Sequence, residues 1–193
     1  MSKTNVDILN KSLKTNFRKR SNAELNRLNP EEFKAAQKIP LVVVLDNVRS
    51  LNNIGSIFRT ADAFRIEEVL LCGITARPPH KDIRKTALGA TESVAWRYFE
   101  QTQEALNDLR SKNYKIAAVE QAENAYALND FEVDLSQGLA VVFGHEVQGV
   151  AQEVVDLCDA VIEIPQFGTK HSLNVSVSAG IVLWNLHGQF FSK

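Results

Sequence analysis

The chain has 193 residues, 45% of them hydrophobic, which is enough for one well-packed domain. No apolar run approaches the roughly 20 residues that span a bilayer, and no signal-peptide core stands at the start, so we expect a soluble, cytoplasmic protein. The two cysteines, Cys72 and Cys158, lie far apart beside strand-like runs, which favours buried free thiols over a disulfide or a metal site.

The net charge of −1 conceals an uneven distribution. Residues 1–38 hold nine Lys or Arg against four Asp or Glu, a charge of +5, whereas the rest of the chain carries −6. A solvated helix is one interpretation of this basic lead. A second basic cluster, the loop at residues 77–85, favours a polyanion partner, because Lys and Arg on phosphates release counterions. The candidate contacts are Lys11, Lys14, Arg18, Lys19, Arg20, Arg84 and Lys85.

Along the chain, strand-like and helical segments alternate, which is typical of a mostly parallel sheet flanked by helices on both faces. Residues 30–38 predict a first helix, with Pro30 in its first turn. The expected strands are 41–45, 68–72, 95–99, 115–119, 139–143 and 160–164, and the helices between them are 53–64, 102–111 and 151–157. Residues 173–190 are too many for one strand and follow helical spacing, so a last helix is expected from near Ser172.

The first of three polar sites follows the strand at 41–45. Asn52 or Asn53 is placed to cap the next helix, and Arg59 lies about two turns further along it. Taken alone, this stretch favours a plain helix cap and a surface Arg59 paired with Asp62.

The other two polar sites follow the strands at 139–143 and 160–164. Gly144 allows a ligand to approach the backbone, and Glu146 is expected at the start of the following helix. Ser172 and Asn174, at the start of the last helix, offer a hydroxyl and an amide to a polar pocket; the alternative is that Ser172 merely caps the helix. Since ligands of open α/β sheets bind at the carboxyl ends of strands, the three sites are expected to act together. The four histidines show no metal-ligand spacing.

Three motifs occur in order along the chain: Asn53-x-Gly55-x-x-x-Arg59, Gly144-x-Glu146-x-x-Gly149 and Ile164-Pro-x-x-Gly168-x-x-x-Ser172-Leu-Asn174. Together they resemble the motif set of the SpoU (TrmH) family of RNA ribose 2′-O-methyltransferases, in the SPOUT superfamily. The resemblance covers roughly residues 40–190. Three motifs in the right order are much harder to meet by chance than one. The chain then divides into a basic helical extension, residues 1–38, and an α/β-knot methyltransferase domain, residues 39–193.

This resemblance implies a fold and a cofactor that the pattern of strands and helices does not reveal. It implies a deep trefoil knot near the C-terminus, although knots are otherwise nearly absent from proteins. It also implies a homodimer with its sites close to the subunit interface. S-adenosylmethionine would lie bent in the knot, held by backbone around Gly144, Ile164 and Leu173, with Ser172 nearby.

Methyl transfer to a ribose 2′-oxygen depends on positioning and needs no metal. The family assigns deprotonation to the arginine that matches Arg59, but a guanidinium stays protonated, so phosphate binding and stabilisation of the developing alkoxide are better physical roles. The resemblance implies that Asn53 and Glu146 orient Arg59 or the ribose, and that Ser172 and Asn174 complete the pocket.

A 2′-hydroxyl acceptor makes the substrate RNA and excludes DNA. Larger members of the family that act on ribosomal RNA carry a separate RNA-binding domain, whereas this chain has a short basic lead. This difference favours tRNA as the substrate, with the D-loop guanosine as the first expectation. Ribosomal RNA is an alternative substrate. A non-catalytic RNA-binding module, and a nucleotide-binding protein that acts on a small molecule, are alternative functions.

Overall fold

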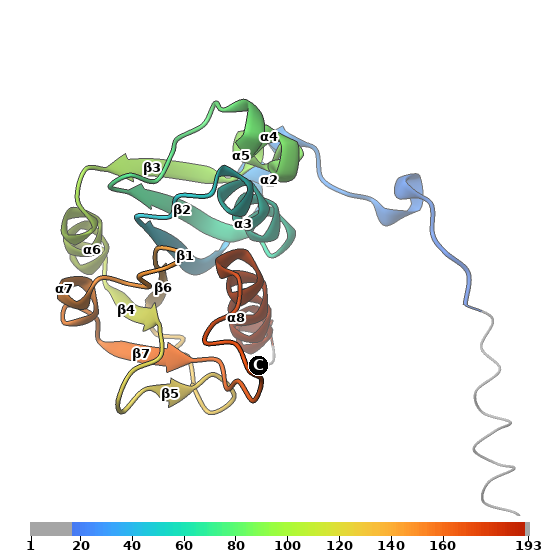
Figure 1. Ribbon diagram of the computed structural model, residues 1–193. Helices are drawn as coiled ribbons and strands as arrows, with labels where there is room; N and C mark the ends of the chain where they lie inside the picture. The colour runs from blue at the N-terminus through green and yellow to red at the C-terminus, as the bar shows by residue number, and fades with distance from the viewer. Residues whose placement is uncertain (1–16, 192–193) are drawn as a thin grey trace, which may run out of the picture.

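The apolar run at residues 41–45 forms the middle of strand β1 (Ile39–Asp46), which is buried along almost its whole length. Such a run suits the interior of a parallel sheet, because helices cover both of its faces. The computed structural model describes residues 17–191 and shows β1 within a seven-stranded sheet of order β3-β2-β1-β6-β4-β7-β5 (Figure 1). The other strands are β2 (Ile66–Cys72), β3 (Ala95–Phe99), β4 (Tyr114–Val119), β5 (Tyr126–Ala127), β6 (Gly138–Phe143) and β7 (Ala160–Glu163).

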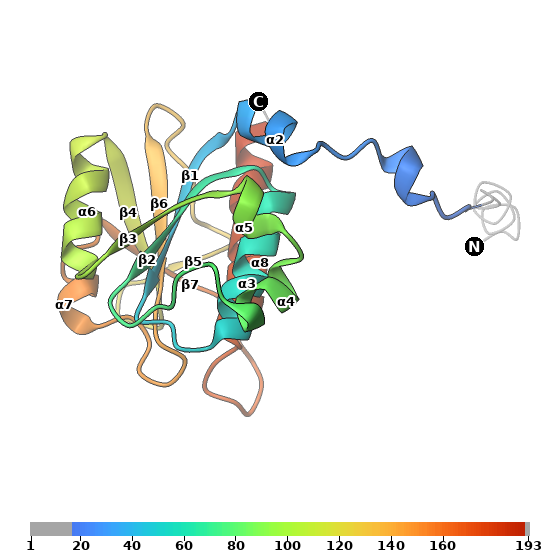
Figure 2. The same cartoon turned by 90° about the horizontal axis from the view of Figure 1, so that it is seen from above.

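Every pairing between these strands is parallel, and helices cover both faces, which confirms the expected fold class (Figure 2). One face carries α2 (Pro30–Ala35), α3 (Leu51–Ala63), α4 (Lys81–Ala87), α5 (Ala90–Ser93) and α8 (Val175–Phe191); the other carries α6 (Thr102–Ser111) and α7 (Gln152–Val155). Apolar side chains fill both layers between helices and sheet. Within residues 17–191, no helix is long and apolar enough to cross a membrane. The threading of the trefoil knot stays a prediction.

The six expected strands are present, each within two residues of the expected bounds. The two-residue β5 was missed. Two helices are shorter than expected: the one predicted at 151–157 is α7, and the one predicted at 30–38 ends at Ala35. There the Lys38 ammonium binds the carbonyl oxygen of Ala36 at 2.8 Å, and the extended backbone of Ala36 turns the chain toward β1.

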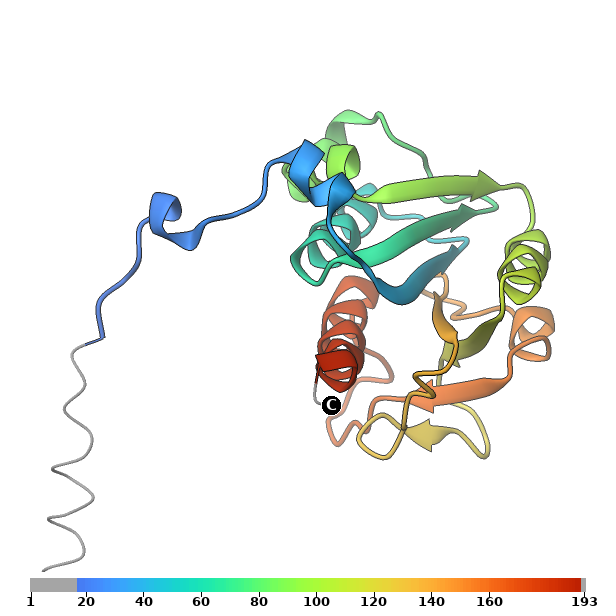
Figure 3. The same cartoon turned by 180° about the vertical axis from the view of Figure 1, so that it is seen from behind.

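Within the basic lead, residues 17–29 extend away from the sheet (Figure 3) and contain only the short 3₁₀ helix η1 (Asn22–Leu25), whereas α2 packs against α5. The expected helix through Arg18 is therefore wrong, since residues 17–20 have no helical structure. Lys11 and Lys14 lie outside the described residues. The second basic cluster is also not purely a loop: α4 begins at Lys81, where the Nδ1 atom of His80 accepts a hydrogen bond from the Asp82 amide at 3.2 Å.

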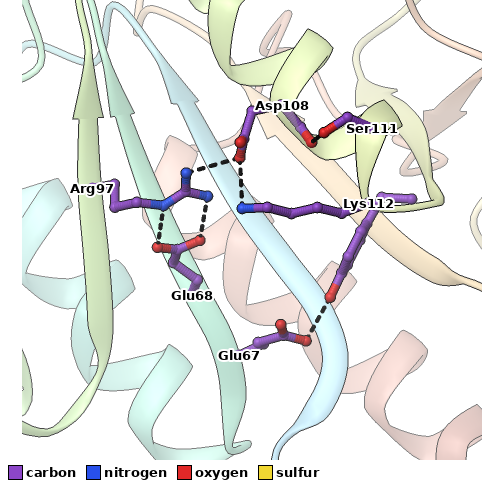
Figure 4. A network of polar contacts seen from close by, with 7 residues as sticks. Glu67, Glu68, Arg97, Asp108, Ser111 and Lys112 are labelled. Carbon is purple, nitrogen blue, oxygen red and sulfur yellow. Dashed lines mark hydrogen bonds and ion pairs between the residues drawn. The ribbon is translucent and has the colours of Figure 1, made fainter.

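A network of charges holds α6 against the outer strands of the sheet (Figure 4). The Arg97 guanidinium of β3 binds both carboxylate oxygens of Glu68 in β2, at 2.7 and 2.8 Å, and reaches Asp108 of α6 at 2.8 Å. Lys112 binds the same Asp108 carboxylate at 2.9 Å. Hydrogen bonding to Glu68 is the main reason why the pKa of Arg97 is raised. The network therefore joins α6 to β2 and β3.

Candidate active site

The loops that follow β1, β6 and β7 lie along one edge of the sheet (Figure 2). β1 and β6 are adjacent and in register to their ends, with Leu45 opposite Phe143, so the first two polar loops start side by side. The third loop runs from β7 to α8, which packs against α3. Parallel pairing therefore brings the three motifs together, as the rule for open α/β sheets predicts.

Glu146 joins the first and second motifs. Its carboxylate accepts hydrogen bonds from the backbone amides of Arg49, at 3.0 Å, and Ser50, at 2.9 Å, and from the side-chain Nδ2 of Asn53, at 2.9 Å. The expectation that Glu146 starts the helix after its own strand is wrong: it lies in a turn, and the next helix begins at Gln152. Its carboxylate instead stabilises the N-terminus of α3, where free amides attract negative charge.

Asn174 adds the third motif to this network. Its Nδ2 donates to the Oδ1 of Asn53 at 3.1 Å, and its Oδ1 accepts from the amide and the hydroxyl of Ser176, at 2.9 and 2.6 Å. An unbroken chain of hydrogen bonds thus runs from Glu146 through Asn53 and Asn174 to Ser176. We call these four residues the motif network.

The caps of the two helices differ from the expected ones. Ser50, not Asn52 or Asn53, caps α3, since its hydroxyl accepts from the Asn53 amide at 3.3 Å. The last helix begins at Val175 rather than near Ser172, and the Asn174 side chain accepts a hydrogen bond from the Ser176 amide in its first turn. The Asn53 side chain and Ser172 therefore do not cap these helices, whereas Asn174 caps α8 and also binds Asn53.

The environment of Glu146 keeps it ionised. Partial burial opposes the charge, but the hydrogen bonds from Arg49, Asn53 and Ser50 outweigh it and lower the pKa of the carboxyl group below its ordinary value. A carboxylate that accepts three N–H groups serves as a fixed anchor, and it is poorly suited to give or take protons near neutral pH.

A cavity of about 260 Å³ opens beside the motif network. All four residues expected at the cofactor, Gly144, Ile164, Ser172 and Leu173, line it, and so does Glu146. Its lining contains three carboxylates and no lysine or arginine; the carboxylates are those of Glu120, Glu146 and Glu163. The cavity therefore has a negative electrostatic character and suits a ligand with positive charge.

Gly144 shapes the wall of this cavity. The turn after β6 folds back so closely that a Cβ atom on Gly144 would collide with the backbone of Gly149 and Val150. Paired hydrogen bonds between His145 and Gly149, at 3.0 and 2.8 Å, close the turn, and Gly149 adopts a φ of 70°. Glycine is needed at Gly144 to avoid this backbone collision, and it suits Gly149 because of the positive φ and the close Glu120 side chain.

Arg59 lies outside the motif network. Its side chain is exposed on α3, and no hydrogen bond or ion pair joins it to another residue between 17 and 191. The alternative that paired it with Asp62 is wrong, since the Asp62 carboxylate accepts a short hydrogen bond, 2.5 Å, from the Ser93 hydroxyl. Arg59 is therefore available to a ligand from outside the chain.

Glu120 and Gln121 line the cavity but belong to none of the three motifs. They follow β4, which lies beside β6 in the sheet. Glu120 directly follows β4, so the rule that ligands bind at the carboxyl ends of parallel strands identifies it once the strand order is known.

The two cysteines are free thiols: Cys72 is buried and Cys158 is only half-buried. Burial raises the pKa of Cys72 to about 12 and that of Cys158 to about 11, so neither is a ready nucleophile near neutral pH. Across the described part of the chain, no cluster of three or more His, Cys, Asp or Glu side chains could hold a metal ion.

Comparisons with known proteins agree with this geometry. The model of the SpoU rRNA methylase family matches residues 40–184. A TrmH family tRNA/rRNA methyltransferase assigned in Staphylococcus haemolyticus is 32% identical over 161 residues; the match covers 81% of this chain and 64% of the relative, so the chain spans just under two thirds of that protein's length. The tRNA (guanosine(18)-2′-O)-methyltransferase of Thermus thermophilus is 33% identical, over 88% of this chain and 86% of the relative.

A solved structure, that of the TrmH/SpoU tRNA modifying enzyme of A. aeolicus, matches with a TM-score of 0.72 and 28% identity. The match covers 83% of this chain and 79% of the chain in the solved structure. The family model spans all three motifs in the order in which they were recognised. The chain therefore belongs to the SpoU rRNA methylase family.

Proposed function

We propose that the protein transfers a methyl group from S-adenosylmethionine to the 2′-hydroxyl of a ribose in structured RNA. The observation that carries this proposal is the motif network, which joins residues from three distant segments beside one cavity. Separate helix caps would not require the hydrogen bonds from Asn53 to Glu146 and from Asn174 to Asn53, which link the three motifs.

The cavity fits S-adenosylmethionine better than it fits a phosphorylated nucleotide. Its volume of about 260 Å³ is close to the range of small-molecule sites, roughly 300–1,000 Å³. A sulfonium and an ammonium are attracted by the three carboxylates in the lining, whereas a polyphosphate is repelled and finds no lysine or arginine there. Gly144, Ile164 and Leu173 would hold the cofactor by their backbone, with Ser172 beside it.

When bound, S-adenosylmethionine would supply an electrophilic methyl group. The ribose oxygen would bond to the methyl carbon as the S–CH₃ bond breaks, S-adenosylhomocysteine would leave with that electron pair, and the hydroxyl proton would pass to water. The motif network fixes the loops around the acceptor, so positioning contributes much of the rate. Arg59 binds a substrate phosphate and stabilises the negative charge that develops on the 2′-oxygen. Because a guanidinium stays protonated, we assign it this electrostatic role in place of that of a base.

Replacement of Arg59 tests this assignment. We expect Arg59→Ala to lower methyl transfer to RNA at least about 100-fold, the size of a lost electrostatic stabiliser, while S-adenosylhomocysteine binds as before. Arg59→Lys keeps the charge without the planar fork and should retain part of the activity. Full activity of Arg59→Ala in a single-turnover assay would remove Arg59 from the mechanism.

We propose tRNA as the substrate, with the D-loop guanosine as the first target, and a cytoplasmic location with that RNA. The relative from Thermus thermophilus, a tRNA (guanosine(18)-2′-O)-methyltransferase matched over 86% of its length, supports this choice. Mapping of ribose methylation in RNA from cells with and without the protein identifies the target. A methyl group lost only from ribosomal RNA would replace tRNA as the substrate, and no loss from either RNA would contradict the enzymatic function.

The basic lead and α4 are the proposed RNA contacts. Lys19, Arg20, Arg84 and Lys85 are exposed, whereas Arg18 is engaged in an ion pair with Glu24 at 2.7 Å. Each phosphate contact adds about 0.9 to the slope of log affinity against log salt.

This salt dependence gives a test of the basic lead. The double variant Lys19→Gln, Arg20→Gln should reduce the slope of tRNA binding by about 2. Lys115→Gln, which removes an exposed charge from β4, serves as the control and should leave the slope unchanged. An unchanged slope in the double variant would contradict a role of the lead in binding RNA.

We further propose that the protein is a homodimer that associates through α8. One side of this helix packs into the core through Ala179, Val182, Leu183 and Leu186, which are fully buried. The other side exposes an apolar stripe: Val177 is 49% exposed, Ile181 39% and Trp184 67%. An exposed apolar stripe on a helix that also carries the third motif is typical of a subunit interface beside a site.

A further inference from the structure

The carboxylate of Glu120 belongs to a residue that lines the cavity but is part of none of the three motifs. This residue follows β4 directly, is half-buried and lines the cavity together with the second and third motifs. Its position at the carboxyl end of a parallel strand is where open α/β sheets bind ligands.

Backbone groups fix the orientation of this carboxylate. The Oε2 atom accepts from the Val150 amide at 3.0 Å, and Oε1 accepts from the Gln121 amide at 2.8 Å. A Cβ atom on Gly149 would collide with Oε2, so the turn after β6 lies directly against the carboxylate. The side chain of Gln121 in turn donates a hydrogen bond to the carbonyl oxygen of His171, at 2.6 Å, and so connects the residues after β4 to the loop of the third motif.

The carboxylate retains capacity for a ligand. An ionised carboxylate accepts about four hydrogen bonds, and backbone amides occupy one site on each oxygen of Glu120. One further acceptor site therefore remains on each of two adjacent oxygens. Two neighbouring hydroxyl groups match this arrangement, because each can donate to one oxygen.

We propose that Glu120 binds the two ribose hydroxyls of the cofactor's nucleoside and so acts as a specificity-determining residue for it. The proposal rests on the proposed function, since it assumes that the cavity binds S-adenosylmethionine. Glu163 offers a contrast: it lines the same cavity, but within residues 17–191 no backbone amide donates a hydrogen bond to its carboxylate. Glu146 also lines the cavity with both oxygens hydrogen-bonded, but its Oε1 already accepts from two donors, Ser50 and Asn53, so it lacks a free acceptor site on each oxygen.

Calorimetric titration with S-adenosylhomocysteine and its 2′-deoxy and 3′-deoxy analogues tests the proposal. The wild-type protein should bind each deoxy analogue about tenfold or more weakly, the effect of losing one hydrogen bond to a charged group. Glu120→Gln should bind S-adenosylhomocysteine more weakly and should discriminate against the analogues by no more than about twofold. Glu163→Gln removes the same charge from the same cavity and should discriminate as the wild type does.

Other outcomes overturn the proposal in distinguishable ways. A wild-type protein that binds all three compounds equally contradicts the role of Glu120 but leaves the proposed function intact. If Glu120→Gln still binds the deoxy analogues more weakly than S-adenosylhomocysteine, groups other than Glu120 bind the hydroxyls. If Glu163→Gln binds all three compounds equally, Glu163 binds the hydroxyls. A wild-type protein that binds none of them at millimolar concentration overturns the proposed function as well.

A second measurement covers the case in which Glu120→Gln fails to fold. A crystal structure of the wild-type protein with S-adenosylhomocysteine should place a ribose oxygen within about 3.2 Å of the Glu120 carboxylate. Ribose oxygens beyond that distance from Glu120 would contradict the proposal.

Discussion

At the scale of single residues, Glu146 determines how the first two motifs meet. Its carboxylate accepts three N–H groups from the loop before α3 and from the first turn of that helix, which lie more than ninety positions earlier in the chain. A side chain that binds so many backbone donors stabilises the fold and also positions Asn53. Loss of Glu146 is therefore expected to affect folding and catalysis together.

Glu146→Gln should lower the free energy of unfolding by about 1–3 kcal/mol, because the amide turns one donor toward the amides that the carboxylate accepted. The folded-state pKa of Glu146 is lowered from its ordinary value of 4.5, so its contribution is complete above that value and is lost as the pH falls through the folded-state pKa. The stability gap between wild type and variant should be constant above about pH 5.5 and narrow at lower pH.

Urea unfolding between pH 3 and pH 7 measures this gap. Glu163→Gln serves as the control, because Glu163 lines the same cavity and no backbone amide of the described part of the chain donates to its carboxylate. A gap between wild type and Glu146→Gln that does not change with pH would contradict the assignment of an ionised, hydrogen-bonded Glu146.

The identity of the polar residues could be predicted from the sequence, but their partners could not. Asn53, Glu146 and Asn174 follow buried strands or begin helices, and such positions are visible in the pattern. Which amide the Glu146 carboxylate binds depends on the relative placement of two loops, and local sequence holds no information on it. For the same reason, capping rules favoured Asn53 for a position that Ser50 occupies.

At the scale of elements, the turn between β6 and α7 carries the second motif and forms one wall of the cavity. Its shape depends on the absence of a side chain at Gly144, where a Cβ atom would meet the backbone of Gly149. Gly168, in the loop between β7 and α8, is different, because a Cβ atom there would meet nothing within 4 Å. The two glycines therefore form a matched pair for substitution.

Gly144→Ala should destabilise the protein by about 1–3 kcal/mol, the cost of overpacking, and should weaken S-adenosylhomocysteine binding at least about tenfold as the turn opens. Gly168→Ala should leave the melting temperature almost unchanged. Thermal unfolding and calorimetric titration of both variants provide the comparison. Equal behaviour of the two variants would contradict the close packing of the turn.

Elements with strong periodic patterns could be located from the sequence, and short ones could not. The apolar run of β1 and the spacing of α6 are long enough to identify each element, and the expected bounds of α6 are those of the structure. β5 has two residues, Tyr126 and Ala127, and exists only because β7 lies beside it. α4 was hidden among basic residues that suggested a loop, since its packing against α3, not its own pattern, makes it a helix.

At the scale of the whole molecule, the exposed stripe on α8 predicts the oligomeric state. The double variant Ile181→Glu, Trp184→Glu should shift the protein from dimer to monomer, because it buries two charges in an apolar interface. Ile74→Glu is a matched control, since Ile74 is 63% exposed on a loop remote from α8 in the chain. Sedimentation velocity distinguishes the two species, and a wild-type protein that sediments as a monomer would contradict the dimer.

The order of strands in the sheet has a consequence for synthesis in the cell. β6 fills the place between β1 and β4, although about 90 residues separate the end of β1 from its start. At about 5–20 residues added per second, β1 spends roughly 5–20 s on the ribosome with one edge unpaired. An unpaired apolar edge is a template for aggregation, so newly made chains should depend on chaperones until β6 has been translated and inserted.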